Sequence, residues 1–157
     1  MIELKNFTDL NQEEITLIWQ WRNDDHVAFF MINKNIKWQE HINFIEKLKQ
    51  DQTKKYFLVF QNDQIIGVID FVNITKSSCE FGLYAKPDLK GVGQILMDQI
   101  KKYAFENLKV QRLKACVFKD NEKALKLYQK NGFVIIREDE NFYYVILNIS
   151  DSKAFIR

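Results

Sequence analysis

The stretch from Ser78 to Leu108 places the strongest constraint on what this chain can fold into. Ser78–Ala85 is an apolar run typical of a strand, and Lys86-Pro87 ends it. A basic loop with Gly91 and Gly93 then opens a long amphipathic segment. Glycine lets the backbone approach a ligand, and the unpaired N–H groups of a first helical turn favour an anion such as a pyrophosphate. An ordinary strand-to-helix turn uses glycine in the same way, so a second motif is needed to distinguish an anion-binding loop from such a turn.

The length of the chain limits the number of domains, and its charge limits the kind of partner to expect. At 157 residues it has the length of one domain, and we expect a single domain over residues 1–150 and a tail over 151–157. Lys and Arg total 23 against 21 Asp and Glu, which gives no reason to expect a nucleic acid partner. No signal-peptide pattern or membrane-length apolar run is present, so we expect a cytoplasmic protein with no membrane partner.

The two cysteines give no sign of a metal or redox centre. Cys79 and Cys116 stand alone in strand-like apolar runs, without the close pairing of metal-binding or redox motifs. We therefore predict two buried thiols in a reducing compartment.

Periodicity along the chain predicts one mixed α/β (α+β) sheet with helices on its faces. Besides 78–85, strands are expected at residues 2–7, 56–60, 65–74, 112–118, 133–137 and 142–148. Helices are expected at residues 11–22, 38–49, 93–108 and 121–130. The run 26–32 is rich in aromatic and apolar residues without a clear period, and it suits either core or the wall of a pocket.

A second motif lies in the helix expected to start at Asn121. Asn121 and Tyr128 are seven residues apart, so two helical turns bring them to nearly the same face, with the small Ala124 between them. An extended ligand can lie against such a stripe. For this helix alone, a capping asparagine and a buried tyrosine explain the same residues, and both interpretations stay open.

The two motifs together resemble the acetyl-CoA-binding core of the GNAT superfamily of N-acetyltransferases. The resemblance rests on Lys90-Gly91-Val92-Gly93 and on Asn121-x-x-Ala124-x-x-Leu127-Tyr128-x-x-x-Gly132-Phe133. It implies a single mixed, mostly antiparallel sheet of about seven strands flanked by about four helices. One residue departs from the pattern: Asp88 stands three residues before the first glycine, where the family usually has Gln or Arg.

The N-terminal third narrows the resemblance. Residues 21–27 and 38–41 resemble the branch that contains ribosomal-protein and nucleotide-sugar acetyltransferases. Over its whole length the chain is similar to the N-acetyltransferases of pseudaminic acid biosynthesis, which acetylate the 4-amino group of UDP-4-amino-4,6-dideoxy-N-acetyl-β-L-altrosamine for flagellin glycosylation. The alternatives are a ribosomal-protein type of protein N-α-acetyltransferase and a non-catalytic acyl-CoA-binding module.

The resemblance implies acetyl-CoA as cosubstrate, with no metal. Backbone N–H groups of the glycine loop would bind the pyrophosphate, and the end of the preceding strand would pair with the pantetheine arm. The implied cofactor-binding residues are Leu83, Tyr84, Ala85, Lys90, Gly91, Val92, Gly93, Gln94, Asn121, Ala124 and Lys130.

The resemblance also implies the chemistry of the site. Tyr128 is the expected general acid for the departing thiolate, because its unperturbed pKa of about 10 keeps it protonated at neutral pH. Glu80, on the strand that leads into the loop, is the expected base, acting directly or through water, and a buried or paired structural carboxylate is the alternative. The rival bases are His26, His41 and Asp70.

The acceptor is expected to be a small nucleotide sugar. Phe30 and Met31 suit an apolar wall for a uracil, and Arg22 suits its diphosphate. Simple core packing is the alternative for the aromatic run. The resemblance also allows a homodimer.

Overall fold

A computed structural model describes residues 1–28, 31 and 35–152 of the chain. They form one seven-stranded sheet in the order β1-β2-β3-β4-β5-β7-β6, and every neighbouring pair is antiparallel except β4 and β5. The strands are β1 (Ile2–Asn6), β2 (Lys55–Gln61), β3 (Gln64–Val72), β4 (Ser78–Ala85), β5 (Arg112–Phe118), β6 (Val134–Glu138) and β7 (Phe142–Asn148). The predicted mixed, mostly antiparallel sheet is confirmed.

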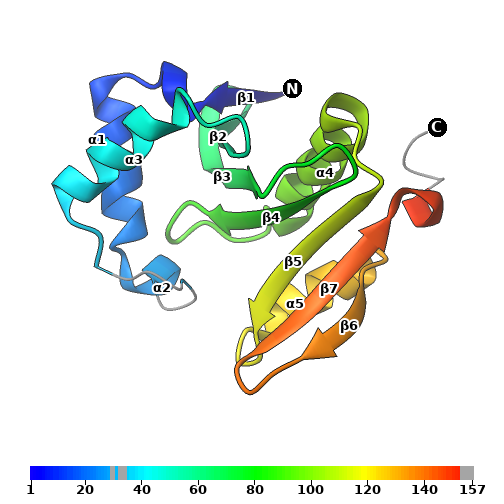
Figure 1. The fold of residues 1–157 in the computed structure, drawn as a ribbon. Coiled ribbons are helices and arrows are strands. Elements are labelled where there is room, and N and C mark those ends of the chain that lie inside the picture. Colours follow the sequence, from blue (N-terminus) through cyan, green and yellow to red (C-terminus); the bar gives the residue numbers. More distant parts are fainter. Residues whose placement is uncertain (29–30, 32–34, 153–157) are drawn as a thin grey trace.

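Helices cover both faces of this sheet. They are α1 (Gln12–Arg22), α2 (Asp25–Ala28), α3 (Trp38–Leu48), α4 (Gly93–Lys102) and α5 (Glu122–Lys130). Short helical turns lie at η1 (Phe7–Asp9), η2 (Tyr103–Leu108) and η3 (Ile149–Ser152). Figure 1 shows α1 and α3 on one side of β1–β4, with α4 on the other side.

The apolar faces of these helices pack on the two faces of the sheet and form a core on each side. On one side, the buried residues are Phe7, Ile18, Trp21, Ile45, Leu48, Leu58 and Val68. On the other side, Leu96, Met97 and Ile100 of α4 are fully buried in a cluster with Ile69 and Phe71 of β3. Side chains alternate across a strand, so β3 supplies apolar residues to both cores.

Two segments differ from the sequence-based expectation. The short helix α2 (Asp25–Ala28) takes in the first three residues of the run 26–32, for which the sequence shows no period. The helix expected over 93–108 widens into a π-helical turn at Tyr103 and ends at Leu108, and the capping residue Lys109 has φ 58°. Hydrophobic spacing alone does not distinguish a wide helical turn from a regular one, because both keep a similar face toward the core.

The sheet opens between β4 and β5, and this opening positions the site. Only Ser78–Glu80 of β4 pair with β5, opposite Arg112–Lys114. From Phe81 onward β4 is paired with β3 alone, and Figure 1 shows β4 and β5 diverging. The edge of β4 that faces β5 therefore has free backbone groups beside α5.

Candidate active site

The loop after β4 is built as a tight turn. Pro87 and Asp88 are its central residues, and the Leu89 N–H donates to the Lys86 carbonyl at 3.0 Å. Asp88 has φ 68°, as the third residue of a type II turn requires, and Asp is among the few side chains that tolerate this region. The departure of Asp88 from the family pattern thus has a backbone role.

The start of α4 is suited to an anion. No side chain caps this helix, and its first turn contains no acidic residue. Gly91, with φ 85°, turns the chain just before it. Uncapped N–H groups at the positive end of a helix favour a phosphate group. The Gln94 side chain is engaged elsewhere: its amide bonds with Asp98 and Asn131, which ties α4 to the end of α5.

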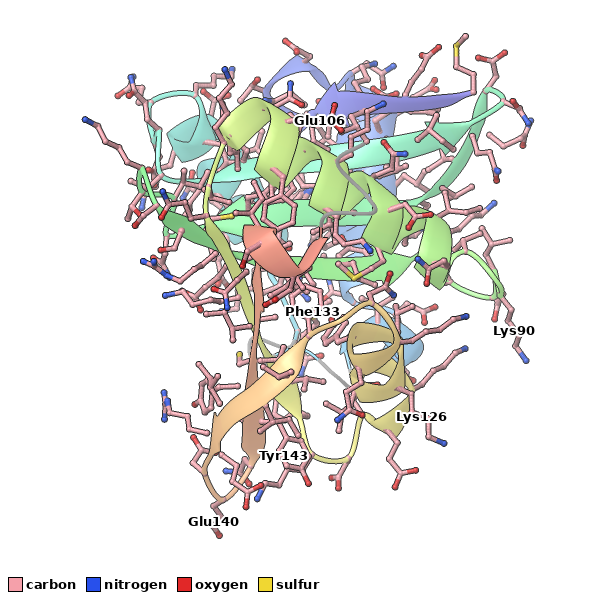
Figure 2. All side chains as sticks on the ribbon, turned by 90° about the vertical axis from the view of Figure 1, so that its right-hand side faces the viewer. Lys90, Glu106, Lys126, Phe133, Glu140 and Tyr143 are labelled. Carbon is pink, nitrogen blue, oxygen red and sulfur yellow. The ribbon has the colours of Figure 1, made fainter. Side chains whose placement is uncertain are left out.

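A cavity of about 1030 Å³ extends from this loop into the opening between β4 and α5. All of the predicted cofactor-binding residues line it, together with Tyr128, Arg22 and Met31. Phe30 lies outside the described residues. Lysines border the cavity as well, and Figure 2 shows Lys90 and Lys126 projecting on the same side of the molecule. Lys126 is not among the predicted cofactor-binding residues, because a lysine on a solvated helix face carries no specific signal.

Tyr128 is fixed against the wall of this cavity. Its ring makes a T-shaped contact with Phe81, with centroids 5.2 Å apart, and lies 5.9 Å from Phe133. Only 6% of the residue is exposed, and burial raises the pKa of its hydroxyl, with the charge of Asp70 adding to the effect. Tyr128 therefore stays protonated at neutral pH. At the other end of α5, the Asn121 Oδ1 accepts the Ala124 N–H at 3.2 Å, so Asn121 caps the helix and lines the cavity.

Charged and phenolic side chains gather on the α1 side of the cavity. Arg22 of α1, Asp70 of β3 and Tyr84 of β4 all line it. Burial raises the pKa of Asp70 to about 7, and the Arg22 guanidinium opposes this shift. Burial also raises the pKa of Tyr84 and of Tyr56, which interact with both charges. Arg22 thus faces a buried carboxylate as well as the cavity.

Glu80 and His41 lie in different surroundings, and the side chain of the third rival base, His26, lies outside the described part of the structure. Glu80 is not among the residues that line the cavity, and its Oε2 accepts a hydrogen bond from Asn73. His41 is buried, and its Nε2 donates to the Ile15 carbonyl at 2.9 Å, joining α3 to α1. Burial lowers the pKa of His41, so it is a neutral structural residue at pH 7.

One of the two cysteine predictions is wrong. Cys79 is buried as expected, and burial raises the pKa of its thiol to about 12. Cys116 is exposed and lines the cavity, because β5 diverges from β4 and leaves this face uncovered. Within residues 1–28, 31 and 35–152, no cluster of His, Cys, Asp and Glu could hold a metal ion. No helix in the same ranges is long and apolar enough to cross a membrane.

The fold, the uncapped helix after a glycine loop and the cavity beside the open edge of β4 are the features of a GNAT acetyltransferase. The family model for an acetyltransferase (GNAT) domain matches residues 4–134. The chain therefore belongs to this family, as the resemblance predicted.

Curated relatives make the comparison more specific. The acetyltransferase PseH of Campylobacter jejuni subsp. jejuni serotype O:23/36 (strain 81-176) is 67% identical over 154 residues, which cover 98% of each chain. The spermidine N(1)-acetyltransferase of Escherichia coli (strain K12) is 25% identical over 145 residues, which cover 87% of this chain and 76% of that protein.

Solved structures agree with this assignment to the GNAT family. The crystal structure of Campylobacter jejuni N-acetyltransferase PseH in complex with acetyl coenzyme A matches with a TM-score of 0.83 and 64% identity, covering 94% of this chain and 99% of that chain. The spermidine N-acetyltransferase of Vibrio cholerae, in complex with CoA and spermine, matches with a TM-score of 0.86 and 19% identity, covering 99% and 98%. At that identity the second match supports the fold alone.

Proposed function

We propose that this protein transfers the acetyl group of acetyl-CoA to the 4-amino group of UDP-4-amino-4,6-dideoxy-N-acetyl-β-L-altrosamine in pseudaminic acid biosynthesis. The observation that carries the proposal is the 67% identity to Campylobacter jejuni PseH over 98% of both chains. The cavity supports it, because one continuous site joins the loop before α4 to the charged side chains of Arg22 and Asp70.

The loop and β4 hold the cosubstrate in this proposal. Backbone N–H groups from Lys90 to Gln94 bind the pyrophosphate, and the surrounding lysines bind the one remaining phosphate, on the ribose. The unpaired edge of β4 at Leu83–Ala85 binds the pantetheine arm as an added strand. Backbone N–H groups there can also stabilise negative charge on the thioester oxygen during transfer.

Tyr128 acts as general acid in the same scheme. Its hydroxyl is protonated at neutral pH, and Tyr128 lines the same cavity as the residues at the open edge of β4. The sugar amine attacks the thioester directly, the carbon–sulfur bond breaks, and the sulfur takes a proton from Tyr128. Neither cysteine is needed as a nucleophile, because no covalent enzyme intermediate forms.

The test is thiol release from acetyl-CoA, measured with the UDP-amino sugar and, in a parallel reaction, with peptide amines. We expect turnover with the sugar and none above background with the peptides. Turnover with peptides alone would replace the proposal by a protein acetyltransferase. Tight acetyl-CoA binding without turnover on any amine would indicate a binding module.

We also propose that the protein is a cytoplasmic homodimer. Its two copies pair along β6, the edge strand next to β7 in the sheet. Val134, Ile135 and Ile136 of this strand are 57%, 39% and 55% exposed, and one edge of β6 has no partner strand in the described chain. An apolar open edge favours pairing with a second copy. Light scattering should give the mass of a dimer for the wild type and of a monomer for Ile136→Lys. A monomeric wild type would refute the dimer, and a dimeric variant would refute this interface.

A further inference from the structure

Asp70 lies directly over the strand that borders the cavity. It pairs with Gly82 in the β3–β4 ladder, so both positions face the same side of the sheet. A Cβ added at Gly82 would lie 2.6 Å from the Asp70 Oδ2. The missing side chain of Gly82 therefore makes room for this carboxylate.

Asp70 and Tyr128 line the same cavity from different elements. Both line it, and the charge of Asp70 contributes to the raised pKa of Tyr128. Asp70 shares the α1 face of β3 with Val68, whereas Tyr128 of α5 packs in the cluster on the α4 side of the sheet. A thioester that lies along the free edge of β4 would have a carboxylate toward one side and a phenol toward the other.

The Asp70 carboxylate is free to accept a proton from a substrate in the cavity. No described residue donates a hydrogen bond to it, and the charge that acts on it is that of Arg22. Asp70 is only partly accessible, and it is one of the residues that line the cavity. Glu80 differs in both respects, because it accepts a hydrogen bond from Asn73 and does not line the cavity.

The surroundings of Asp70 suit a base at neutral pH. Burial raises its pKa to about 7, against the opposing effect of Arg22 from α1. The other titratable groups that face it are Tyr56 of β2, Tyr84 of β4 and Tyr128 of α5, and burial raises the pKa of each. Those phenols stay protonated, so Asp70 is the group among them that changes charge near pH 7. A base is most effective when its pKa lies near the working pH.

We propose that Asp70 is the general base of acetyl transfer, paired with Tyr128 as the acid. The neutral amine nitrogen forms a bond to the thioester carbon, and one of its protons passes to Asp70. The carbon–sulfur bond breaks, the electron pair leaves on sulfur, and sulfur takes the Tyr128 proton. The proton on Asp70 returns to Tyr128 through water in the cavity, so the enzyme ends unchanged. This assignment rests on the proposed acetyl transfer and not on which amine is the acceptor.

Asp70→Asn tests the proposal against Asp63→Asn, which removes the same charge from an exposed hairpin turn. With acceptor and acetyl-CoA saturating, kcat should fall at least 100-fold in Asp70→Asn, about what a general base contributes. The KM for acetyl-CoA should stay within about twofold of the wild type, since Asp70 lies apart from the pyrophosphate loop. A kcat within about threefold of wild type would overturn the proposal, and a loss confined to Glu80→Gln would return the role to Glu80.

The same assay separates this proposal from the proposed function. Turnover of the UDP-amino sugar by the wild type decides the function, and the ratio of variant to wild-type kcat decides the role of Asp70. If the wild type acetylates only peptide amines, the ratio is measured with those amines. Absence of turnover with every amine overturns both.

The wild type provides a second measurement in case Asp70→Asn does not fold. The acidic limb of its kcat–pH profile should lie near pH 7, set by Asp70. Two acceptors whose amines differ in pKa should give the same limb. A limb that moves with the amine, or a flat profile across neutral pH, would overturn the assignment.

Discussion

The two halves of the cavity are built in different ways. The half that faces the glycine loop is organised around one continuous stretch, β4 to the first turn of α4, with α5 beside it. In the proposed mode of binding, this stretch holds acetyl-CoA mainly through backbone groups. The half that faces α1 is assembled from side chains of three elements, Arg22 of α1, Asp70 of β3 and Tyr84 of β4. The first half depends on local turn geometry, and the second depends on how tertiary packing buries charge.

This difference predicts which kinetic constant each half controls. A change in the loop should alter the affinity for acetyl-CoA, because the loop has no side chain that transfers a proton. A change around Asp70 should alter kcat and its pH dependence, because burial there sets the strength of the base. The following variants test this division, starting with the largest expected effect.

Gly82→Ala should lower kcat about 100-fold. The new Cβ would lie 2.6 Å from the Asp70 Oδ2, so the carboxylate must move, and misplacing a catalytic group by about 1 Å can cost that much. The measurement is steady-state kinetics at saturating acetyl-CoA, together with acetyl-CoA binding by calorimetry.

The double variant provides the control for this prediction. Adding Gly82→Ala to Asp70→Asn should lower kcat by less than about threefold, because the displaced group is already inactive. Additive losses would show that Gly82 acts through something other than Asp70.

Tyr128→Phe should lower kcat at least tenfold and leave acetyl-CoA binding nearly intact. The substitution removes the proton donor and keeps the ring that packs on Phe81. Tyr143→Phe is a matched control, since Tyr143 lies on β7, where its ring contacts Lys119. An unchanged kcat in Tyr128→Phe would remove Tyr128 from the mechanism.

Most of the fold and the loop half of the cavity could be predicted from the sequence. The strands at 78–85, 112–118 and 142–148 begin and end where expected, because each is an apolar run with clear turn signals at its ends. The glycine loop was identifiable because backbone geometry leaves a local signature in residue type.

The half around Asp70 could be anticipated only in part. Asp70 was one of several rival bases, since no local pattern distinguishes a buried carboxylate near an arginine from a surface one. Its pairing with Gly82 becomes apparent only in the register of β3 and β4. The exposure of Cys116 was missed for the same reason: the divergence of two strands has no signature within either of them.

Arg22→Gln should shift the acidic limb of the kcat–pH profile to higher pH. The Arg22 guanidinium lowers the pKa of Asp70, so its removal raises that pKa above about 7 and leaves less ionised base at neutral pH. We expect kcat to fall by roughly threefold to tenfold at pH 7 and to recover at higher pH. Arg22→Lys keeps the charge and should keep the limb. A raised KM for the nucleotide sugar with an unmoved limb would instead favour a diphosphate-binding role for Arg22.

Gly91→Ala should have the smallest effect, confined to acetyl-CoA affinity. Gly91 has φ 85°, and a side chain in this region costs roughly 1 kcal/mol, which corresponds to about a fivefold weaker Kd if the loop must keep its shape to bind. Nothing lies within 4 Å of the added Cβ, so strain alone is tested. Gly132→Ala provides the control: its φ is 94°, but it lies after α5, outside the residues that line the cavity. It should lower thermal stability without changing acetyl-CoA affinity. If Gly91→Ala lowered kcat instead, the loop would take part in the chemistry and the division between the two halves would fail.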